Sequence, residues 1–279
     1  MSETISDLIE RYSGTLSHIS DTPQLDCQLL LTHALTKGRD WLFAHSDDTL
    51  DGQTQTRFVE LVKRRQKGEP VAYLTGSKGF WNREFQVTPA TLIPRPETEL
   101  LIEILLERFD ESPRSVIDLG TGTGAIAISL AAERSAWQVH AVDIDEDAVR
   151  IAQNNAADLD NIDISQGNWF DGIEGSFDMI VSNPPYIAAG DSHLESLRHE
   201  PLRALASGAE GLDDIRMIVS KAQEFLAEKG VLLLEHGYDQ QEAIVTLLEE
   251  ANFKHIERFK DLQGLPRAVM AQSPRDSTA

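Results

Sequence analysis

The apolar residues of the first 66 positions recur with the spacing of amphipathic helices. One helix is predicted to begin at Thr22-Pro23, because a threonine followed by a proline is typical of a helix start. The apolar residues that follow it at helical spacing are Leu25, Leu29, Leu30 and Ala34. A second helix is predicted over residues 55–66, with inward positions at Phe58, Val59, Leu61 and Val62. The basic residues at 63–65 suit its C-terminal end, where the helix dipole is negative.

The pattern changes between residues 68 and 99, where glycines and prolines interrupt any helix. Residues 80–88 alternate in the manner of a β-hairpin, with a turn near Asn82-Arg83. Pro96 is suited to the first turn of a helix that reaches about Phe109. We therefore expect an N-terminal helical domain over residues 1–75, a hairpin and linker over 76–95, and a larger domain over 96–279.

From Ser115 onward, short apolar segments alternate with helical patterns. The predicted strands are Val116–Leu119, Val139–Asp143, Phe177–Val181, Val231–Leu234 and Ala268–Ala271. Asp145 is expected to cap the helix that follows the second of them. This alternation predicts an α/β fold with a doubly wound, mainly parallel sheet.

Charge and cysteine content narrow the classes of function. Lys and Arg number 25 against 46 Asp and Glu, a net charge of -21 that repels phosphate and disfavours a direct nucleic-acid substrate. The one cysteine, Cys27, excludes an internal disulfide and a thiolate metal cluster. The polar, acidic start is unlike a signal peptide, and no apolar run reaches the roughly 20 residues of a membrane span. We expect a cytoplasmic protein that does not bind membranes.

Three alternating glycines lie between the first predicted strand and its helix, in Gly120-Thr121-Gly122-Thr123-Gly124. Such a turn lets the backbone approach a ligand at the carboxyl end of a sheet. Asp143 ends the next strand about 20 residues later, where its carboxylate can accept both ribose hydroxyls. These residues alone fit a nicotinamide cofactor and S-adenosylmethionine equally well. Asp118, just before the turn, either contacts the cofactor or fixes the loop.

A stiff polar turn, Asn183-Pro184-Pro185-Tyr186, follows the strand Phe177–Val181. The two prolines keep it extended, so the Asn183 side-chain oxygen and the Pro184 carbonyl can both accept from one NH2 group. Tyr186 offers a flat face to a planar acceptor. The lone pair of an amide or arylamine nitrogen is delocalised, so two acceptors are needed to aim it at a methyl donor. Asn183, Pro184 and Tyr186 are therefore the predicted catalytic residues.

The motifs together resemble those of the peptide chain release factor N5-glutamine methyltransferases over nearly the whole chain. They are RRQKGEPVAYLTG from Arg64, TLIPRPETE from Thr91, DLGTGTGAIAI from Asp118, NWF from Asn168, SNPPYI from Ser182, Glu200-Pro201 with Ala204-Leu205, and LLEHG from Leu233. The resemblance implies a class I methyltransferase (Rossmann-like) sheet with a small N-terminal helical domain that docks the substrate. It implies a monomer that methylates, in translation termination, the glutamine of the Gly-Gly-Gln loop of release factors.

By the same resemblance, the glycine loop from Gly120 to Gly124 and Asp143 bind S-adenosylmethionine, and Trp169 flanks its adenine. The segment from Asn183 to Tyr186 holds the substrate glutamine, and Asn183 also borders the cofactor. Position 168 departs from the family pattern, because asparagine replaces aspartate there. Its side-chain oxygen still accepts from the adenine amine, so cofactor binding is expected to survive in weaker form.

Three other functions fit part of these features. A nucleic-acid amino methyltransferase would use the same cradle, but the acidity of the chain disfavours it. A nicotinamide oxidoreductase explains the glycine loop and leaves Asn183 to Tyr186 without a role. A non-catalytic adaptor would not need both Asp143 and Asn183. Arg95 and Glu97 either line the site or fix the loop, which we favour, and His236 is either a proton relay or structural.

Overall fold

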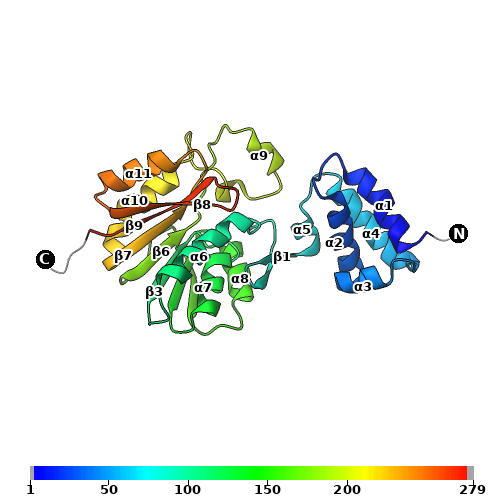
Figure 1. The fold of residues 1–279 in the computed structure, drawn as a ribbon, viewed down its shortest axis with the longest axis horizontal. Helices are drawn as coiled ribbons and strands as arrows, with labels where there is room; N and C mark the ends of the chain where they lie inside the picture. Colours follow the sequence, from blue (N-terminus) through cyan, green and yellow to red (C-terminus); the bar gives the residue numbers. More distant parts are fainter. Residues whose placement is uncertain (1–2, 275–279) are drawn as a thin grey trace. The chain divides into compact units, whose positions relative to one another are not determined.

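A computed structural model describes residues 3–274, and the chain divides into two compact units that meet in sequence between Ser77 and Lys78. The first unit is helical (blue to cyan in Figure 1). Its helices are α1 (Ile5–Leu16), α2 (Pro23–Leu35), α3 (Arg39–Ala44), α4 (Gly52–Arg65) and α5 (Val71–Thr75). The second unit contains a β-hairpin and an α/β sheet with its helices.

The two helices predicted from periodicity are present in the first unit. Helix α2 begins at Pro23 after Thr22, as predicted. Helix α4 begins at Gly52, three residues before the predicted start, because the Asp51 side chain accepts from two backbone N–H groups there. Leu30 and Phe58 are fully buried in the core of this unit, whereas Leu25 is 36% exposed.

The hairpin and the helix after it also form, with shifted ends. Strands β1 (Ser77–Phe80) and β2 (Arg83–Gln86) flank a turn at Trp81-Asn82, one residue earlier than predicted. Trp81 adopts a positive φ of 52°, and its backbone N–H donates to Glu99 at 2.8 Å. Pro96 opens a 3-10 turn, η1 (Pro96–Thr98), which continues directly into helix α6 (Glu99–Arg108).

Seven strands form the sheet, in the order β5-β4-β3-β6-β7-β9-β8. Their bounds are β3 (Ser115–Leu119), β4 (Gln138–Asp143), β5 (Ile162–Gln166), β6 (Phe177–Ser182), β7 (Leu226–Glu235), β8 (Lys254–Lys260) and β9 (Pro266–Gln272). The strands from β5 to β7 pair in parallel, and β9 runs antiparallel to both of its neighbours. The predicted mainly parallel sheet is therefore confirmed. The two edge strands, β5 and β8, were not predicted from the sequence, because polar side chains interrupt their apolar pattern.

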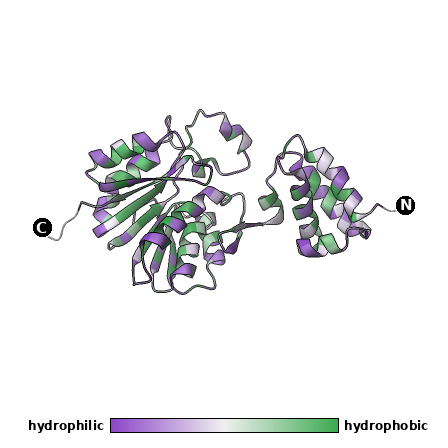
Figure 2. Cartoon of the chain, viewed as in Figure 1, coloured by the Kyte–Doolittle hydropathy of each residue, from purple (hydrophilic) through white to green (hydrophobic). Residues whose placement is uncertain are grey.

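Helices cover both faces of the sheet, as Figure 1 shows. Helices α6, α7 (Ala125–Glu133) and α8 (Glu146–Asn155) pack on one face, and α10 (Asp213–Phe225) and α11 (Gln241–Glu250) pack on the other. Successive residues of a strand point to opposite faces of the sheet and pack against different helices. In β3, Val116 packs under α7, and Ile117 faces the opposite side. The central strands of the sheet are accordingly mainly hydrophobic in Figure 2, whereas the edge strand β8 is largely hydrophilic. The predicted cap of α8 by Asp145 is confirmed.

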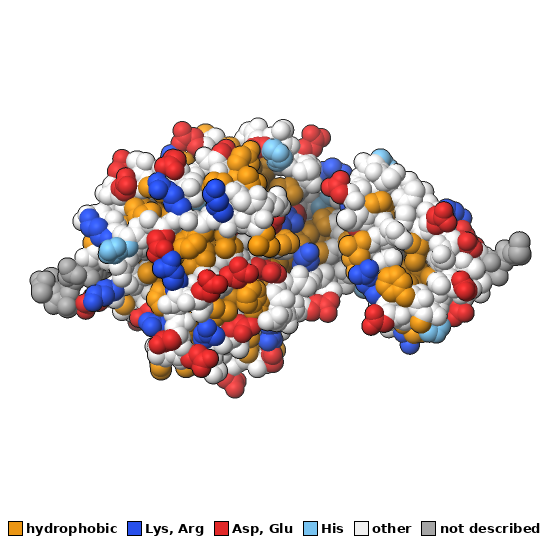
Figure 3. All heavy atoms as spheres, viewed as in Figure 1, with side chains coloured by type: hydrophobic (Ala, Val, Ile, Leu, Met, Phe, Trp, Pro, Cys, Tyr) orange, Lys and Arg blue, Asp and Glu red, His pale blue; other side chains and the backbone are white. Residues whose placement is uncertain are grey.

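Between β6 and α10 the chain forms a long connection with short helices α9 (His193–Ser196) and η2 (Leu202–Ala204). The connection returns to the sheet edge, since the Ile187 N–H donates to the Leu205 carbonyl at 2.8 Å. Acidic and basic side chains are interspersed on the face shown in Figure 3. Within residues 3–274, no helix combines the length and apolar character needed to span a membrane.

Candidate functional site

The glycine loop lies where the sequence predicted, between the end of β3 and the start of α7. Gly120 and Gly122 have φ angles of 74° and 57°, in the left-handed region that favours glycine. The N–H groups of Gly120 and Thr121 both donate to the Val142 carbonyl at 2.9 Å. The loop is thereby fixed at the carboxyl ends of β3 and β4, which is the ligand-binding edge of such a sheet.

Asp143 lies opposite this loop at the end of β4. Its carboxylate accepts from the Gly122 N–H at 2.8 Å and from the Asp145 N–H at 2.9 Å. Burial raises the pKa of Asp143, and these two backbone hydrogen bonds oppose that rise. The side chain also lines a cavity, so the structure brings Asp143 and the glycine loop together as predicted from their spacing.

The sequence left two roles open for Asp118, contact with the cofactor or fixing of the loop, and the structure shows the second. It is fully buried and accepts from the Thr121 hydroxyl at 2.6 Å. Burial raises its pKa to about 7. Thr121 lies in the glycine loop, so the contact that Asp118 makes is one that fixes the loop.

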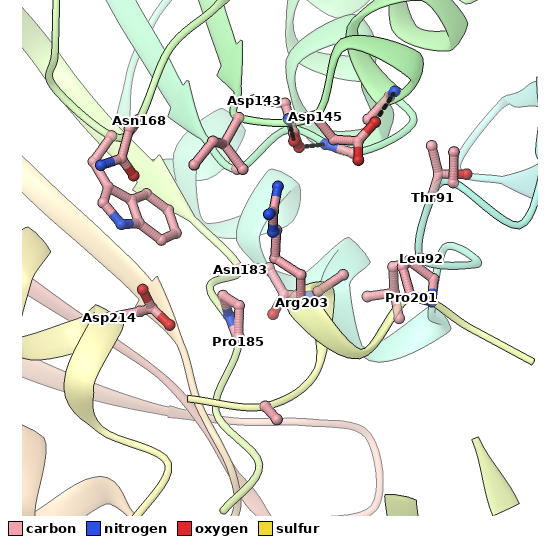
Figure 4. Close-up of a pocket in the computed structure, with 18 of the residues that line it drawn as sticks. Thr91, Leu92, Asp143, Asp145, Asn168, Asn183, Pro185, Pro201, Arg203 and Asp214 are labelled. Carbon is pink, nitrogen blue, oxygen red and sulfur yellow. Dashed lines mark hydrogen bonds between the residues drawn. The ribbon is translucent and has the colours of Figure 1, made fainter. Parts of the chain in front are cut away.

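A cavity of about 270 Å³ opens beside the loop (Figure 4). Gly120, Asp143, Asn168, Trp169 and Asn183 are among the residues that line it. A Cβ atom at Gly120 would lie 3.2 Å from the Trp169 ring, so glycine is needed for the indole to lie against the loop. Of the predicted cofactor residues, Gly120, Gly122, Asp143, Trp169 and Asn183 thus surround one space, whereas Thr121, Thr123 and Gly124 are not among the residues that line it.

Two further side chains at this cavity were not anticipated. Ile144 follows Asp143 and keeps 42% of its surface exposed, although it is apolar. Arg203, from η2, points its guanidinium toward Asp143 and Asp145 in Figure 4. Ile144 could have been noticed as an apolar residue directly after a strand-end carboxylate, whereas Arg203 lies in a connection without periodic pattern.

The segment Asn183-Pro184-Pro185-Tyr186 follows β6, next to β3. The Ser182 hydroxyl donates to the Leu119 carbonyl at 2.6 Å and ties the two strand ends together. The Asn183 Nδ2 donates to the Thr98 hydroxyl at 3.0 Å, and the Tyr186 hydroxyl donates to Glu235 at 3.3 Å. Both side chains of the segment are therefore held by residues that are distant in sequence.

A second cavity of about 220 Å³ lies on the other side of this segment. It is lined by Leu92, Arg95, Asn183, Pro184, Tyr186, Ile187, Leu197, Ala204 and Leu205. Asn183 lines both cavities, together with Leu92 and Ala204. Pro184 and Tyr186 line only the second cavity, and Pro185 lines only the first. The site thus consists of two adjoining spaces with Asn183 between them.

Arg95 has both of the roles that the sequence allowed for it. It lines the second cavity, and its guanidinium pairs with the buried Glu200, which also accepts from the Ile93 N–H at 3.1 Å. His236 is buried and its Nδ1 contacts the Gly237 carbonyl at 2.8 Å. Burial lowers the pKa of His236, which is the behaviour of a structural neutral imidazole.

Comparison with known proteins places this site in a family. The family model for the methyltransferase small domain matches residues 96–260, and that for the PrmC N-terminal domain matches residues 7–76. A release factor glutamine methyltransferase from Coxiella burnetii is 43% identical over 274 residues, which cover 96% of this chain and 99% of that protein. The chain belongs to the release factor glutamine methyltransferase family. A second member, from Pseudomonas aeruginosa, is 45% identical over 92% of this chain and 95% of its own length.

Solved structures agree with a class I methyltransferase fold for this family member. The T. thermophilus 16S rRNA N2 G1207 methyltransferase, in complex with AdoMet and guanosine, has a TM-score of 0.53 at 25% identity and covers 71% of this chain and 49% of that one. The hMettl16 catalytic domain has a TM-score of 0.55 at 20% identity over 70% and 77% of the two chains.

S-adenosylmethionine is the cofactor of this methyltransferase. The residues present fit it, because the glycine loop admits close backbone approach and Asp143 faces the cavity with a carboxylate suited to ribose hydroxyls.

Proposed function

We propose that this protein transfers the methyl group of S-adenosylmethionine to the side-chain amide nitrogen of the glutamine in the Gly-Gly-Gln motif of peptide chain release factors. It thereby acts in translation termination. The observation that carries the proposal is the position of Asn183, which lines both the cofactor cavity and the adjoining acceptor cavity. A group that must meet donor and acceptor at once has to lie at such a boundary.

Asn183 and Pro184 are assigned the recognition of the acceptor NH2 group. Because the Asn183 Nδ2 is engaged by Thr98, the side-chain oxygen is the end left to face the acceptor. The Pro184 peptide oxygen supplies a second acceptor, and two acceptors orient the nitrogen lone pair toward the donor. The Tyr186 ring and the apolar side chains of the second cavity suit the flat amide and the methylene groups of glutamine.

The cofactor assignments rest on the first cavity. Gly120 to Gly124, with Thr121 and Thr123 between the glycines, bring backbone to the cofactor; Asp143 accepts from its ribose. Trp169 and Asn168 border the region assigned to adenine. When bound, S-adenosylmethionine supplies an electrophilic methyl group on a sulfonium and a neutral leaving group, so the protein need only position and desolvate the acceptor.

The N-terminal helical unit is proposed to dock the release factor, with residues 1–75 as the docking domain, 76–95 as hairpin and linker, and 96–279 as the methyltransferase domain. We propose a cytoplasmic monomer. A nucleobase is the second acceptor to consider, because a neighbour of similar fold is a 16S rRNA methyltransferase in complex with guanosine. The net charge of -21 favours the protein acceptor, since it opposes binding to phosphates.

Asn183→Ala provides the test. Methyl transfer to a purified release factor would be followed with radiolabelled cofactor, and the modified residue identified by mass spectrometry of tryptic peptides. We expect Asn183→Ala to abolish transfer while calorimetric cofactor affinity stays near that of the parent. Asn154→Ala, at an exposed position on α8, is the matched control and should retain full activity. Methylation of an RNA fragment in place of the release factor, or undiminished transfer by Asn183→Ala, would overturn the assignment.

A further inference from the structure

The guanidinium of Arg95 is only partly engaged by its ion pair. The side chain lines the second cavity and keeps 34% of its surface exposed. Its Nη2 donates to the Glu200 carboxylate. Its Nε and Nη1 form no hydrogen bond or ion pair with any of residues 3–274. Because a guanidinium carries several N–H donors in a fixed fork, donors of Arg95 remain available at this cavity.

Glu200 holds this guanidinium in place. Its side chain is only 4% exposed, and both of its oxygens are engaged. One accepts from the Arg95 Nη2, and the other accepts from the Ile93 N–H at 3.1 Å. The pair joins the segment before η1 to the connection between β6 and α10, across 105 residues. Arg95 is therefore pre-organised, which lowers the entropic cost of a further hydrogen bond.

The donor groups of the other polar side chains at this cavity already have partners. Among the lining residues, only Arg95, Asn183 and Tyr186 have polar side chains. The Asn183 Nδ2 donates to Thr98, and the Tyr186 hydroxyl donates to Glu235. A peptide that enters the cavity brings carbonyl groups, which must be hydrogen-bonded when they are buried. Arg95 offers most of the unengaged side-chain donors that could serve them.

We propose that Arg95 donates to the peptide carbonyl groups of the two glycines that precede the substrate glutamine. It is then a residue that determines specificity for the Gly-Gly-Gln backbone. The inference rests on the proposed function, in which this cavity takes the glutamine. Glycine fits this mode of recognition, because no side chain shields its peptide groups from a guanidinium.

The ion pair with Glu200 suits a site that adjoins a sulfonium. An unpaired guanidinium would repel the positive charge of the cofactor and the charge that develops on the amide nitrogen as it is methylated. The Glu200 carboxylate offsets the charge of Arg95. Hydrogen bonds to the neutral backbone are made equally before and during transfer, so their loss should raise KM and leave kcat unchanged.

A double-mutant cycle between Arg95 and the substrate carbonyls tests the proposal in the full-length chain. Semisynthetic release factors would carry an alkene in place of the Gly-Gly or the Gly-Gln peptide bond, which keeps the extended shape and removes the carbonyl. With unmodified release factor, Arg95→Gln should raise KM about 10–100-fold, as expected for lost charge-assisted hydrogen bonds, with parental kcat and cofactor affinity.

The combination of both changes is the decisive measurement. At least one alkene substrate should raise the KM of the parent by a similar factor. With Arg95→Gln, that alkene should add no further increase, whereas independent effects would multiply. Loss of the peptide N–H affects both enzymes alike and cancels in the cycle. Arg95→Lys keeps a positive charge beside Glu200 without the second N–H edge, so it should behave as Arg95→Gln.

Arg150→Gln is the matched control, because it removes an exposed arginine on α8 that pairs with Asp147. It should keep the parental KM and the full alkene effect. Effects of Arg95→Gln and of both alkenes that multiply, or a parental KM in Arg95→Lys, would overturn the inference and leave Arg95 a structural role only. A parent that does not methylate unmodified release factor would refute the proposed function and this inference with it. Multiplying effects in an active parent would refute the inference alone.

Discussion

The burial of Asp118 makes the stability of the methyltransferase domain depend on pH in a calculable way. Its side chain is fully buried beneath the glycine loop, with the Thr121 hydroxyl at 2.6 Å and the charge of Asp143 nearby. Burial raises its pKa from 3.8 to about 7. The native state therefore holds this proton over a range in which the unfolded chain has released it. The stabilisation is complete below the unfolded pKa and is lost as pH rises through about 7.

Asp118→Asn removes that titration and keeps a side chain of the same shape. One pKa unit corresponds to about 1.4 kcal/mol of free energy. Between pH 5 and pH 8 the free energy of unfolding of the parent should therefore fall by about 3 kcal/mol relative to that of the variant. Any constant effect of the substitution cancels, because only the change with pH is compared. The stability of the variant relative to the parent is thus expected to increase as the pH rises.

Hydrogen exchange of the β3 amides measures this difference locally, which suits a chain with two compact units. Parent and Asp118→Asn would be compared at the same pH, so that intrinsic exchange rates cancel. An opening free energy that differs by the same amount at pH 5 and pH 8 would refute the reasoning and show that Asp118 does not hold its proton in the native state.

Three substitutions probe the two cavities. Asp143→Ala should raise the calorimetric Kd for S-adenosylmethionine about 10–100-fold, because it removes charge-assisted hydrogen bonds, and an unchanged Kd would contradict the ribose assignment. Gly120→Ala forces an alanine to a φ of 74° with its Cβ 3.2 Å from the Trp169 ring, so the melting temperature and the cofactor affinity should both fall. Gly211→Ala would place a Cβ 2.2 Å from the Tyr186 carbonyl oxygen; we expect slower transfer with normal cofactor affinity, and parental transfer would mean that the loop yields freely.

Much of the fold could be predicted from local sequence pattern, because interactions between residues close in the sequence determine where these helices and strands form. The strands that end at Leu119, Asp143 and Ser182 have apolar residues on both faces, as a sheet covered by helices requires. Each of these strands is followed by a turn or a helix cap that ends it. The edge strand Lys254–Lys260 was missed because a partly exposed strand carries charges that hide its period. Its presence depends on pairing with β9, which is a tertiary contact.

The candidate site, too, could be predicted from the sequence only in part. The sequence alone determined that a glycine loop, a strand-end carboxylate and a proline-stiffened asparagine would gather at one edge of the sheet, since parallel strands bring their carboxyl ends together. Only the tertiary structure decided what holds them. Thr98 reaches Asn183 across 85 residues, and Glu235 reaches Tyr186 across 49. Hydrogen bonds between such distant positions follow from strand order and register, and no local pattern encodes which buried donor will meet which acceptor.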